Sequence, residues 1–282
     1  MIKYGSDPEV FAIDSDGGVV PPVIFREELG LEFEENGRHP IFIRGDGFYV
    51  HEDGVAFEVG VTPSDTLDEN LAKVQSAYQS LEELLSKYGY RLGILPAVPF
   101  DTGKWGVKPR WIRDCMIFGC DADHDAFDFN RKGSTVDAMK HPWRYGGGHL
   151  HVSGMDIFHA DPVASIKVLA STVGLATVAF SDVTILEKQR TFLYGKPGKY
   201  RPQRYPDGSH GIEYRTPSNT WSRPGNPVWE PLKDYFDLAL RILSGGQYER
   251  LIADFGDVVK DTIVEQRQDD AKLILSKVVG YA

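Results

Sequence analysis

Three consecutive glycines followed by alternating polar side chains constrain this chain more than any other stretch. The segment Gly146–Ser153 reads Gly-Gly-Gly-His-Leu-His-Val-Ser. Because side chains alternate between faces along a β-strand, we expect His149, His151 and Ser153 on one face and apolar residues on the other. The glycines allow a close approach of the backbone to a ligand, or a sharp bend at the strand entry. The combination favours a site for a metal ion and phosphates over a half-solvated strand that carries two histidines by chance.

The length of the chain allows one large domain or two. We expect a single catalytic domain over residues 1–282, with a helical C-terminal part from about residue 227 packed on it. The net charge of −10 argues against nucleic acid and against an anionic membrane as partners. It does not exclude a nucleotide site, since phosphate binding needs only a few local cations or metal ions.

Cysteine usage and the N-terminus indicate a soluble, cytoplasmic protein. Cys115 and Cys120 are too few for a disulfide scaffold and do not have the spacing of a zinc ribbon, so we expect reduced thiols. The N-terminus is charged almost at once and does not read as a signal peptide. The longest apolar stretch, Val163–Phe180, is interrupted by polar residues, which argues against a membrane span.

Strands early and in the middle of the chain, with helices between and after them, predict an α+β fold with an antiparallel sheet rather than a βαβ series. A capping box at Thr66–Glu69 and a first-turn proline after Asp161 begin two helices. Expected strands are 8–13, 19–20, 41–44, 47–51, 55–61, 90–95, the histidine strand and 211–217. Expected helices are 66–88, one from residue 161, 231–244, and two or three short ones within 248–279. Expected loops are 24–40, the 96–145 stretch, which we assign to the substrate site, and 187–210.

Acidic residues inside otherwise apolar strands form the first chemical set. An ionised carboxylate on a buried sheet face is costly unless a cation or hydrogen bonds compensate it. One such residue alone is best explained by an exposed strand face, but several together with an imidazole indicate metal ions. Oxygen-rich ligation with one imidazole favours Mg²⁺ or Mn²⁺. The residues are Asp7, Glu9, Glu58, His149 and Glu213.

Basic residues in the second half form the other set. The planar guanidinium group of arginine matches phosphate oxygens in a two-point contact. Glycines at 195 and 198 leave room for a polyphosphate to approach, although a solvated basic loop explains the lysines equally well. Carboxylates for metal and arginines for phosphate together indicate phosphoryl transfer. The set comprises Arg190, Arg201, Arg204 and Arg215, with Lys188, Lys196 and Lys199.

With these motifs in this order, the chain resembles the superfamily of glutamine synthetases and glutamate–cysteine ligases, most closely the compact amidoligases encoded by phages. The resemblance covers the acidic opening strand, the histidine strand, and the late Glu-x-Arg-x-Pro strand. Weaker matches occur around Glu58 and in the second hundred residues. The matching segments are Gly5–Phe11, Gly146–Ser153, Glu213–Pro217, Glu58 with Thr62-Pro63, Phe118–Asp121, Arg144, and Tyr194-Gly195 to Tyr200-Arg201.

The resemblance implies a curved antiparallel sheet that forms a funnel-like active site, with helices packed on its outer face. It also implies ATP and Mg²⁺ (or Mn²⁺) as cofactors, with one metal ion facing the carboxylate substrate and another bridging ATP. The third ligand of the first metal is left open between Asp53 and His51. The implied metal ligands are Glu9 and Glu58 on the first metal, and Asp7, His149 and Glu213 on the second. The implied nucleotide contacts are Gly147, Gly148, His151, Ser153, Arg190 and Arg201. The implied catalytic residues are Arg190, Arg201, Arg215 and Glu58.

The activity implied is that of an ATP-dependent carboxylate–amine ligase, which forms an amide or isopeptide bond through an acyl phosphate. The carboxylate and amine could belong to small molecules, peptides or proteins, and the oligomeric state is open. If the chain is phage-encoded, it would act in the host-cell cytoplasm. Two alternatives are a metal-dependent amidohydrolase, which does not need the arginines, and a non-catalytic phage binding protein that retains the fold.

Overall fold

One large antiparallel sheet organises the protein. The computed structural model describes residues 1–31, 40–106, 108–109, 112–113, 116, 124–128, 137–205 and 208–282. Within them, the sheet has the order β3-β4-β5-β1-β10-β12-β11-β8, and β2 and β6 also pair with β1. Its strands are β1 Lys3–Ile13, β2 Val19–Val20, β3 Ile41–Gly45, β4 Phe48–Asp53, β5 Ala56–Val61, β6 Arg91–Gly93, β8 His124–Asp125, β10 Gly148–Ser153, β11 Lys199–Arg204 and β12 His210–Tyr214. A separate pair consists of β7 Ala97–Pro99 and β9 Trp143–Tyr145.

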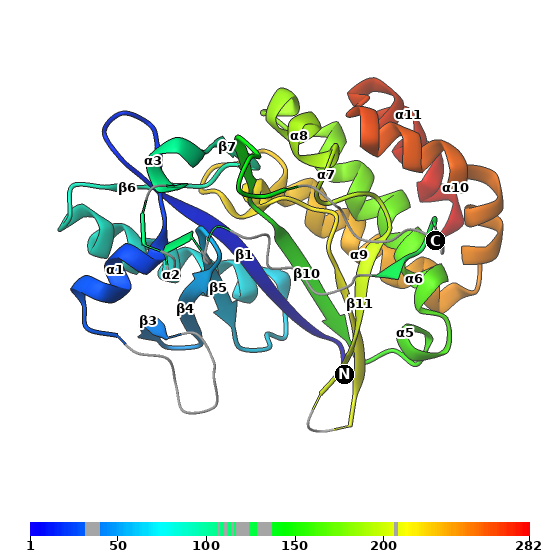
Figure 1. Cartoon of the computed structure of the whole chain (residues 1–282). Helices are drawn as coiled ribbons and strands as arrows, with labels where there is room; N and C mark the ends of the chain where they lie inside the picture. The colour runs from blue at the N-terminus through cyan, green and yellow to red at the C-terminus, as the bar shows by residue number, and fades with distance from the viewer. Residues whose placement is uncertain are drawn as a thin grey trace.

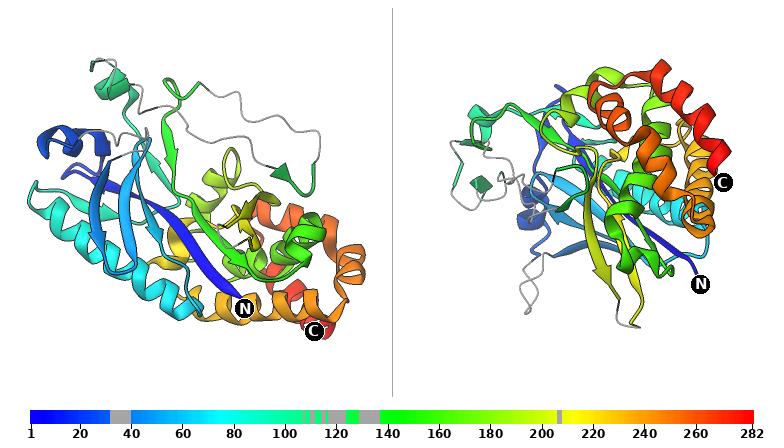
Figure 2. Two further views of the ribbon diagram at one scale, coloured as in Figure 1. Left: turned by 90° about the horizontal axis from the view of Figure 1, so that it is seen from below. Right: turned by 90° about the vertical axis from the view of Figure 1, so that its right-hand side faces the viewer.

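The long helices lie on one side of this sheet, as the left view of Figure 2 shows for α2 and α9. Figure 1 shows β1 and β10 crossing the middle of the molecule in front of them. The α+β class with an antiparallel sheet is therefore confirmed, and the sheet is open rather than closed into a barrel. The helices are α1 Pro22–Glu28, α2 Leu67–Ser86, α3 Thr102–Gly106, α5 Ile157–Ala160, α6 Pro162–Leu169, α7 Leu175–Ala179, α8 Thr184–Thr191, α9 Trp229–Gly245, α10 Tyr248–Glu265 and α11 Gln268–Val278.

Helix α2 covers the β1–β5–β4 part of the sheet. The Thr66 hydroxyl accepts a hydrogen bond from the Glu69 amide at 3.1 Å, as the capping box predicts. The Glu69 carboxylate reaches back one residue further than expected, to the amide of Asp65 at 2.9 Å. The buried face of the helix carries Val74, Tyr78, Leu81 and Leu85, as expected for an amphipathic helix packed on a sheet.

The helical run that follows Asp161 is an interior element. Asp161 caps it by accepting from the Ala164 amide at 2.9 Å, as predicted. By length and composition alone, Pro162–Ala179 meets the criteria for a membrane span, with 18 residues and a mean hydropathy of 1.5. However, 78% of it is buried inside the protein. Its hydroxyl groups donate to carbonyls of the preceding turn, which allows polar residues such as Thr172 in this core position.

Two expected loops contain helices. Residues 22–28 form α1, because Pro22 opens a helix whose Phe25 packs among Phe57, Tyr88 and Tyr90. The basic 187–210 stretch contains the end of α8 and all of β11. The C-terminal helices α10 and α11 have 18 and 11 residues and pack on α6 and α7, so α10 is longer than expected. Cys115, Cys120 and the Phe118–Asp121 motif lie outside the described residues.

Candidate active site

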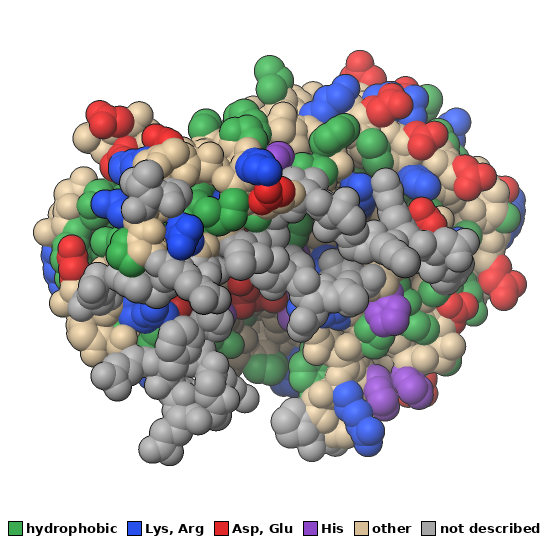
Figure 3. Space-filling view, viewed as in Figure 1, with side chains coloured by type: hydrophobic (Ala, Val, Ile, Leu, Met, Phe, Trp, Pro, Cys, Tyr) green, Lys and Arg blue, Asp and Glu red, His purple; other side chains and the backbone are tan. Residues whose placement is uncertain are grey.

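The face of the sheet opposite the helices carries the acidic residues. The Ser6 hydroxyl donates to Asn70 of α2 at 2.8 Å, so Ser6 points toward the helices. Because side chains alternate, its neighbours Asp7 and Glu9 point to the other face. Figure 3 shows this face, where acidic side chains lie at the floor of a recess near its centre.

Three carboxylates meet where β1, β5 and β4 run side by side. The strand register places Glu9 opposite Glu58, and Glu58 opposite His51. Glu9, Asp53 and Glu58 each offer one oxygen, and these oxygens all lie within 4.8 Å of one another. The His51 Nε2 atom lies 3.0 Å from Glu58 Oε1, at the side of this group. Of the two residues left open by the sequence, Asp53 therefore belongs to the cluster; we call Glu9, Asp53 and Glu58 the carboxylate cluster.

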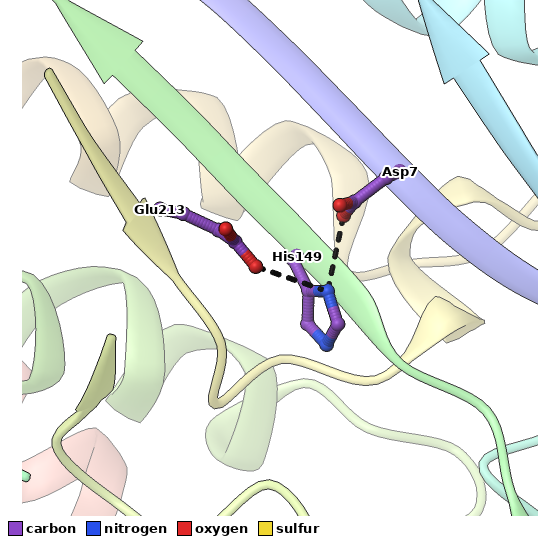
Figure 4. A group of neighbouring side chains, drawn as sticks. All are labelled: Asp7, His149 and Glu213. Atoms are coloured by element: carbon purple, nitrogen blue, oxygen red, sulfur yellow. Dashed lines mark ion pairs between the residues drawn. The ribbon is translucent and has the colours of Figure 1, made fainter. Parts of the chain in front are cut away.

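A second group forms on the other side of β1 (Figure 4), and we call Asp7, His149 and Glu213 the histidine cluster. The Nδ1 atom of His149 lies 3.1 Å from Asp7 Oδ1 and 3.6 Å from Glu213 Oε1. The same Asp7 reaches the second histidine, because His151 Nε2 lies 3.3 Å from Asp7 Oδ2. Asp7 lies opposite His149, and His151 opposite Glu213, so the antiparallel register alone brings distant parts of the chain together.

Two atoms of the histidine cluster are buried without a hydrogen-bond partner among the described residues. They are Asp7 Oδ1 and His149 Nδ1. Leaving a buried polar atom unsatisfied costs about 1–3 kcal/mol, so such a pair calls for an explanation. Both are good ligand atoms for a divalent cation, and a donor set of carboxylate oxygens with one imidazole nitrogen fits Mg²⁺ or Mn²⁺. The residues present therefore fit a metal ion on the grounds of burial and donor chemistry.

The ionisation of the site reflects crowding of like charges in a buried place. Burial raises the pKa of Glu9, and Asp53 raises it further. Burial also raises the pKa of Glu58, with Asp7 and Glu9 adding to the effect. For Asp7, the effect of burial is outweighed by the charged forms of the His149 and His151 imidazoles, so the pKa of Asp7 is held well below its usual value. A cation between these groups would offset the burial and the repulsion that raise the pKa of Glu9 and Glu58.

Hydrogen bonds fix the position of Glu9 from three sides. The Gly147 amide donates to Glu9 Oε2 at 2.7 Å, and the Tyr194 hydroxyl donates to Glu9 Oε1 at 3.0 Å. The Asn219 side chain donates to the Glu9 carbonyl at 2.6 Å. Sequence reasoning missed both Tyr194 and Asn219 as site residues. Only the Tyr194-Gly195 pair carried a signal, and only as part of the resemblance.

The glycines before the histidine strand serve packing. A Cβ at Gly148 would collide with the Ser218 carbonyl, and a Cβ at Gly147 would lie 2.5 Å from His149 Nε2. The Trp221 indole also donates to the Gly148 carbonyl at 2.8 Å. We expected these glycines to admit a ligand, but the 218–221 segment and the site's own side chains occupy the space. A backbone contact from Gly147 or Gly148 to a nucleotide stays a prediction.

Arg190 differs most from its expected setting. It lies on α8 rather than in an open loop, and it is fully buried. Its two terminal nitrogens donate to the carbonyls of Thr216 and Pro217 at 2.7 and 3.0 Å. The guanidinium also takes up the space above Gly195, where a Cβ would collide with it. The reason for the glycine at 195 is thus a protein side chain rather than a polyphosphate.

The remaining arginines lie at different depths around Glu213. Arg215 is buried and forms an ion pair with Glu213 Oε1. The Arg201 side chain, 30% exposed, lies opposite Glu213 on β11, with its Nη1 3.9 Å from the same oxygen. Gln203 also donates to Glu213 at 2.8 Å; it was missed, although its i, i+2 spacing from Arg201 could have indicated it. Arg204 is exposed at the end of β11.

The other predicted residues are more peripheral. Lys188 is exposed on α8, and Lys199 faces Asp125 at 3.8 Å. Gly198 packs against Phe127, whose ring a Cβ at 198 would meet at 2.5 Å. Ser153 ends β10 four residues from His149, which at a strand rise of about 3.3 Å places it about 13 Å away. Any nucleotide contact of Ser153 therefore lies away from both clusters.

Solved structures that align with this chain do so at low sequence identity. No protein-family profile and no curated protein sequence matches it. An apo GmaS structure without ligand aligns with a TM-score of 0.44 and 14% identity, covering 99% of this chain and 64% of that one. A cryo-EM structure of Plasmodium falciparum glutamine synthetase aligns with a TM-score of 0.42 and 12% identity, covering 84% of this chain and 50% of that one. The chain thus spans less than two thirds of the length of either protein.

Proposed function

We propose that this protein is an ATP-dependent carboxylate–amine ligase that forms an amide or isopeptide bond through an acyl phosphate. The observation that carries the proposal is the pair of adjacent clusters, in which Asp7 Oδ1 and His149 Nδ1 are buried and face each other without a hydrogen bond. Two neighbouring cation sites suit a reaction in which phosphate charge must be neutralised on both sides of the transferred group. The order of the motifs along the chain adds support.

The two clusters would hold different cations. Asp7, His149 and Glu213 would hold one Mg²⁺ ion near the nucleotide, and the carboxylate cluster would hold another near the carboxylate substrate. When bound, these ions neutralise phosphate charge and polarise the transferred phosphoryl group. Of the protein's own groups, the partly exposed Arg201 would bind phosphate oxygens. Arg215 lies deeper, beside Glu213, where it balances the charge of that carboxylate.

Arg190 acts on this site through the backbone. By binding the carbonyls of Thr216 and Pro217, it fixes the segment that follows Arg215. Glu187 on the same helix accepts hydrogen bonds from Ser218 and Thr220 at 2.5 and 2.9 Å, which holds the next residues of that segment. We therefore assign Arg190 a positioning role in place of the phosphate contact expected from the sequence.

A metal-dependent amidohydrolase is the second candidate. The observation that favours it is that Arg190 donates hydrogen bonds to two protein carbonyls and so does not face a phosphate. Hydrolysis by a metal-activated water does not need an arginine that binds phosphate. The two functions differ in their need for nucleotide. A ligase releases phosphate from ATP only when an amine and a carboxylate are both present, whereas an amidohydrolase cleaves amides without ATP.

The deciding experiment measures phosphate release from ATP and Mg²⁺ across a panel of carboxylates combined with a panel of amines. The proposal expects release with at least one pair, and none with either partner alone. The Glu58→Gln variant serves as the inactive reference, and Glu230→Gln, an exposed position on α9, as the matched control. Amide cleavage without ATP would replace the ligase by the hydrolase. Undetectable nucleotide binding in Mg²⁺ would favour a non-catalytic binding protein.

A further inference from the structure

The Tyr194 hydroxyl connects the two clusters. It donates to Glu9 Oε1 of the carboxylate cluster at 3.0 Å and lies 3.3 Å from Nε2 of His149 in the histidine cluster. Glu9 lies on β1 and His149 on β10, so the tyrosine contacts one side chain from each of two neighbouring strands. These contacts are at hydrogen-bond distance and within the site.

The hydrogen count of this bridge fixes the tautomer of His149. A phenol has one proton, and Tyr194 gives it to Glu9. When Glu9 is ionised and His149 is neutral, the phenol oxygen accepts from His149, so the imidazole proton lies on Nε2. The Nδ1 atom of His149 is left with a free lone pair, and this is the atom that faces Asp7 and Glu213. A hydrogen bond to the far nitrogen is the usual way in which a protein orients a metal-binding histidine.

The surroundings hold the tyrosine ring in this place. Its ring stacks parallel to Tyr145, with centroids 6.3 Å apart and an angle of 10°. The Arg190 guanidinium lies over the ring at 5.1 Å. Gly147 provides the space in which the three polar groups meet, because a Cβ there would lie 2.5 Å from His149 Nε2 and 3.1 Å from Glu9 Oε1. These contacts therefore hold the Tyr194 ring in the position that bridges Glu9 and His149.

We propose that Tyr194 is a positioning residue that presets His149 for a cation and couples the two clusters. The part that concerns cations rests on the proposed function; the tautomer assignment does not. Since one hydroxyl contacts a ligand from each cluster, occupation of one cluster orders a ligand of the other. The expected result is positive coupling between two Mn²⁺ binding events, which disappears when the hydroxyl is removed.

The tautomer is tested on the metal-free protein by ¹⁵N NMR of labelled histidines at about pH 8, above the range in which an unperturbed imidazole titrates. The His149 signals are assigned by their loss in His149→Gln. The wild type is expected to show a protonated Nε2 and a bare Nδ1, and Tyr194→Phe a mixture of the two tautomers. The control is Tyr145→Phe, which removes a hydroxyl bonded to His141 from the adjacent ring. Identical His149 signals in wild type and Tyr194→Phe would overturn the assignment.

Cation binding is tested by calorimetry with Mn²⁺ on the same three proteins. Loss of a group that orients a ligand typically lowers metal affinity by about 10–100-fold, and we expect this for Tyr194→Phe but not for Tyr145→Phe. Wild-type affinity and coupling in Tyr194→Phe would overturn the role of Tyr194 and leave the proposed function intact. A wild type that binds no Mn²⁺ would overturn the proposed function and the coupling together, while the NMR result still decides the tautomer.

Discussion

Asp7 Oδ1 and His149 Nδ1 lie 3.1 Å apart across the β1–β10 pair, both buried and neither hydrogen-bonded to any described residue. Two acceptor atoms at this distance repel each other unless a proton or a cation lies between them. The opposing register of the two strands makes this contact unavoidable once the strands pair. The site is thus a consequence of sheet formation, and its chemistry depends on what occupies the space between these two atoms.

Replacement of Glu213 tests the histidine cluster. Glu213→Gln keeps the shape of the side chain but removes a charged ligand, so we expect folding with a wild-type circular dichroism spectrum. Affinity for Mn²⁺ should fall by about tenfold or more, and ATP turnover should be lost. Calorimetry and phosphate release measure the two effects, with Glu230→Gln as the control. Undiminished turnover in Glu213→Gln would remove this residue from the site.

Acidification should weaken cation binding. Burial raises the pKa of Glu9 and Glu58, so these groups take up protons at a higher pH than ordinary glutamates. Because a cation binds the ionised form, affinity is full above the raised pKa values and falls as the pH drops through them, and binding releases protons. Titration of Mn²⁺ in buffers with different ionisation heats measures this release. Glu58→Gln should release fewer protons than wild type; equal release would contradict the assignment.

Replacement of Arg190 separates a structural from a phosphate-binding role. Arg190→Met removes two hydrogen bonds to buried carbonyls and leaves Glu187 without its nearby positive charge. We expect the free energy of unfolding to fall by about 3 kcal/mol. Urea denaturation measures this loss, and Arg204→Met, at an exposed position, is the control. A variant with unchanged stability and weakened nucleotide binding would restore the phosphate role.

Replacement of Gly148 tests the close packing of the strand entry. In Gly148→Ala the added Cβ meets the Ser218 backbone, which cannot move aside as a flexible side chain can. We expect a loss of about 3 kcal/mol or failure to fold. Gly245→Ala is the matched control, because a Cβ there meets no described atom within 4 Å, and its stability should stay within about 0.5 kcal/mol. Equal stabilities in the two variants would contradict this account of the glycine.

The alternation of side chains between the two faces of a single strand could be predicted from the sequence. It placed His149, His151 and Ser153 on one face of a strand, because a period of two depends only on local geometry. The capping residues Thr66 and Asp161 were readable for the same reason. The antiparallel sheet followed from the order of strands and helices, and the structure confirms it.

Contacts that depend on strand register and tertiary packing could not be predicted from the sequence. The approach of Asp53 to Glu58 depends on how β4 pairs with β5, which no local pattern encodes. The burial of Arg190 depends on the segment after Arg215 crossing over α8. Tyr194 enters the site because its ring stacks on Tyr145, far from it in the sequence. In each case the missing information is which distant segment lies next to the residue.

Anomalous X-ray scattering from a crystal soaked with Mn²⁺ and a non-hydrolysable ATP analogue would locate the cations and the nucleotide together. We expect one manganese peak among Asp7, His149 and Glu213, a second among Glu9, Asp53 and Glu58, and the terminal phosphate of the analogue between them. The absence of manganese from both clusters under conditions that saturate the nucleotide, or manganese bound only elsewhere, would contradict this expectation.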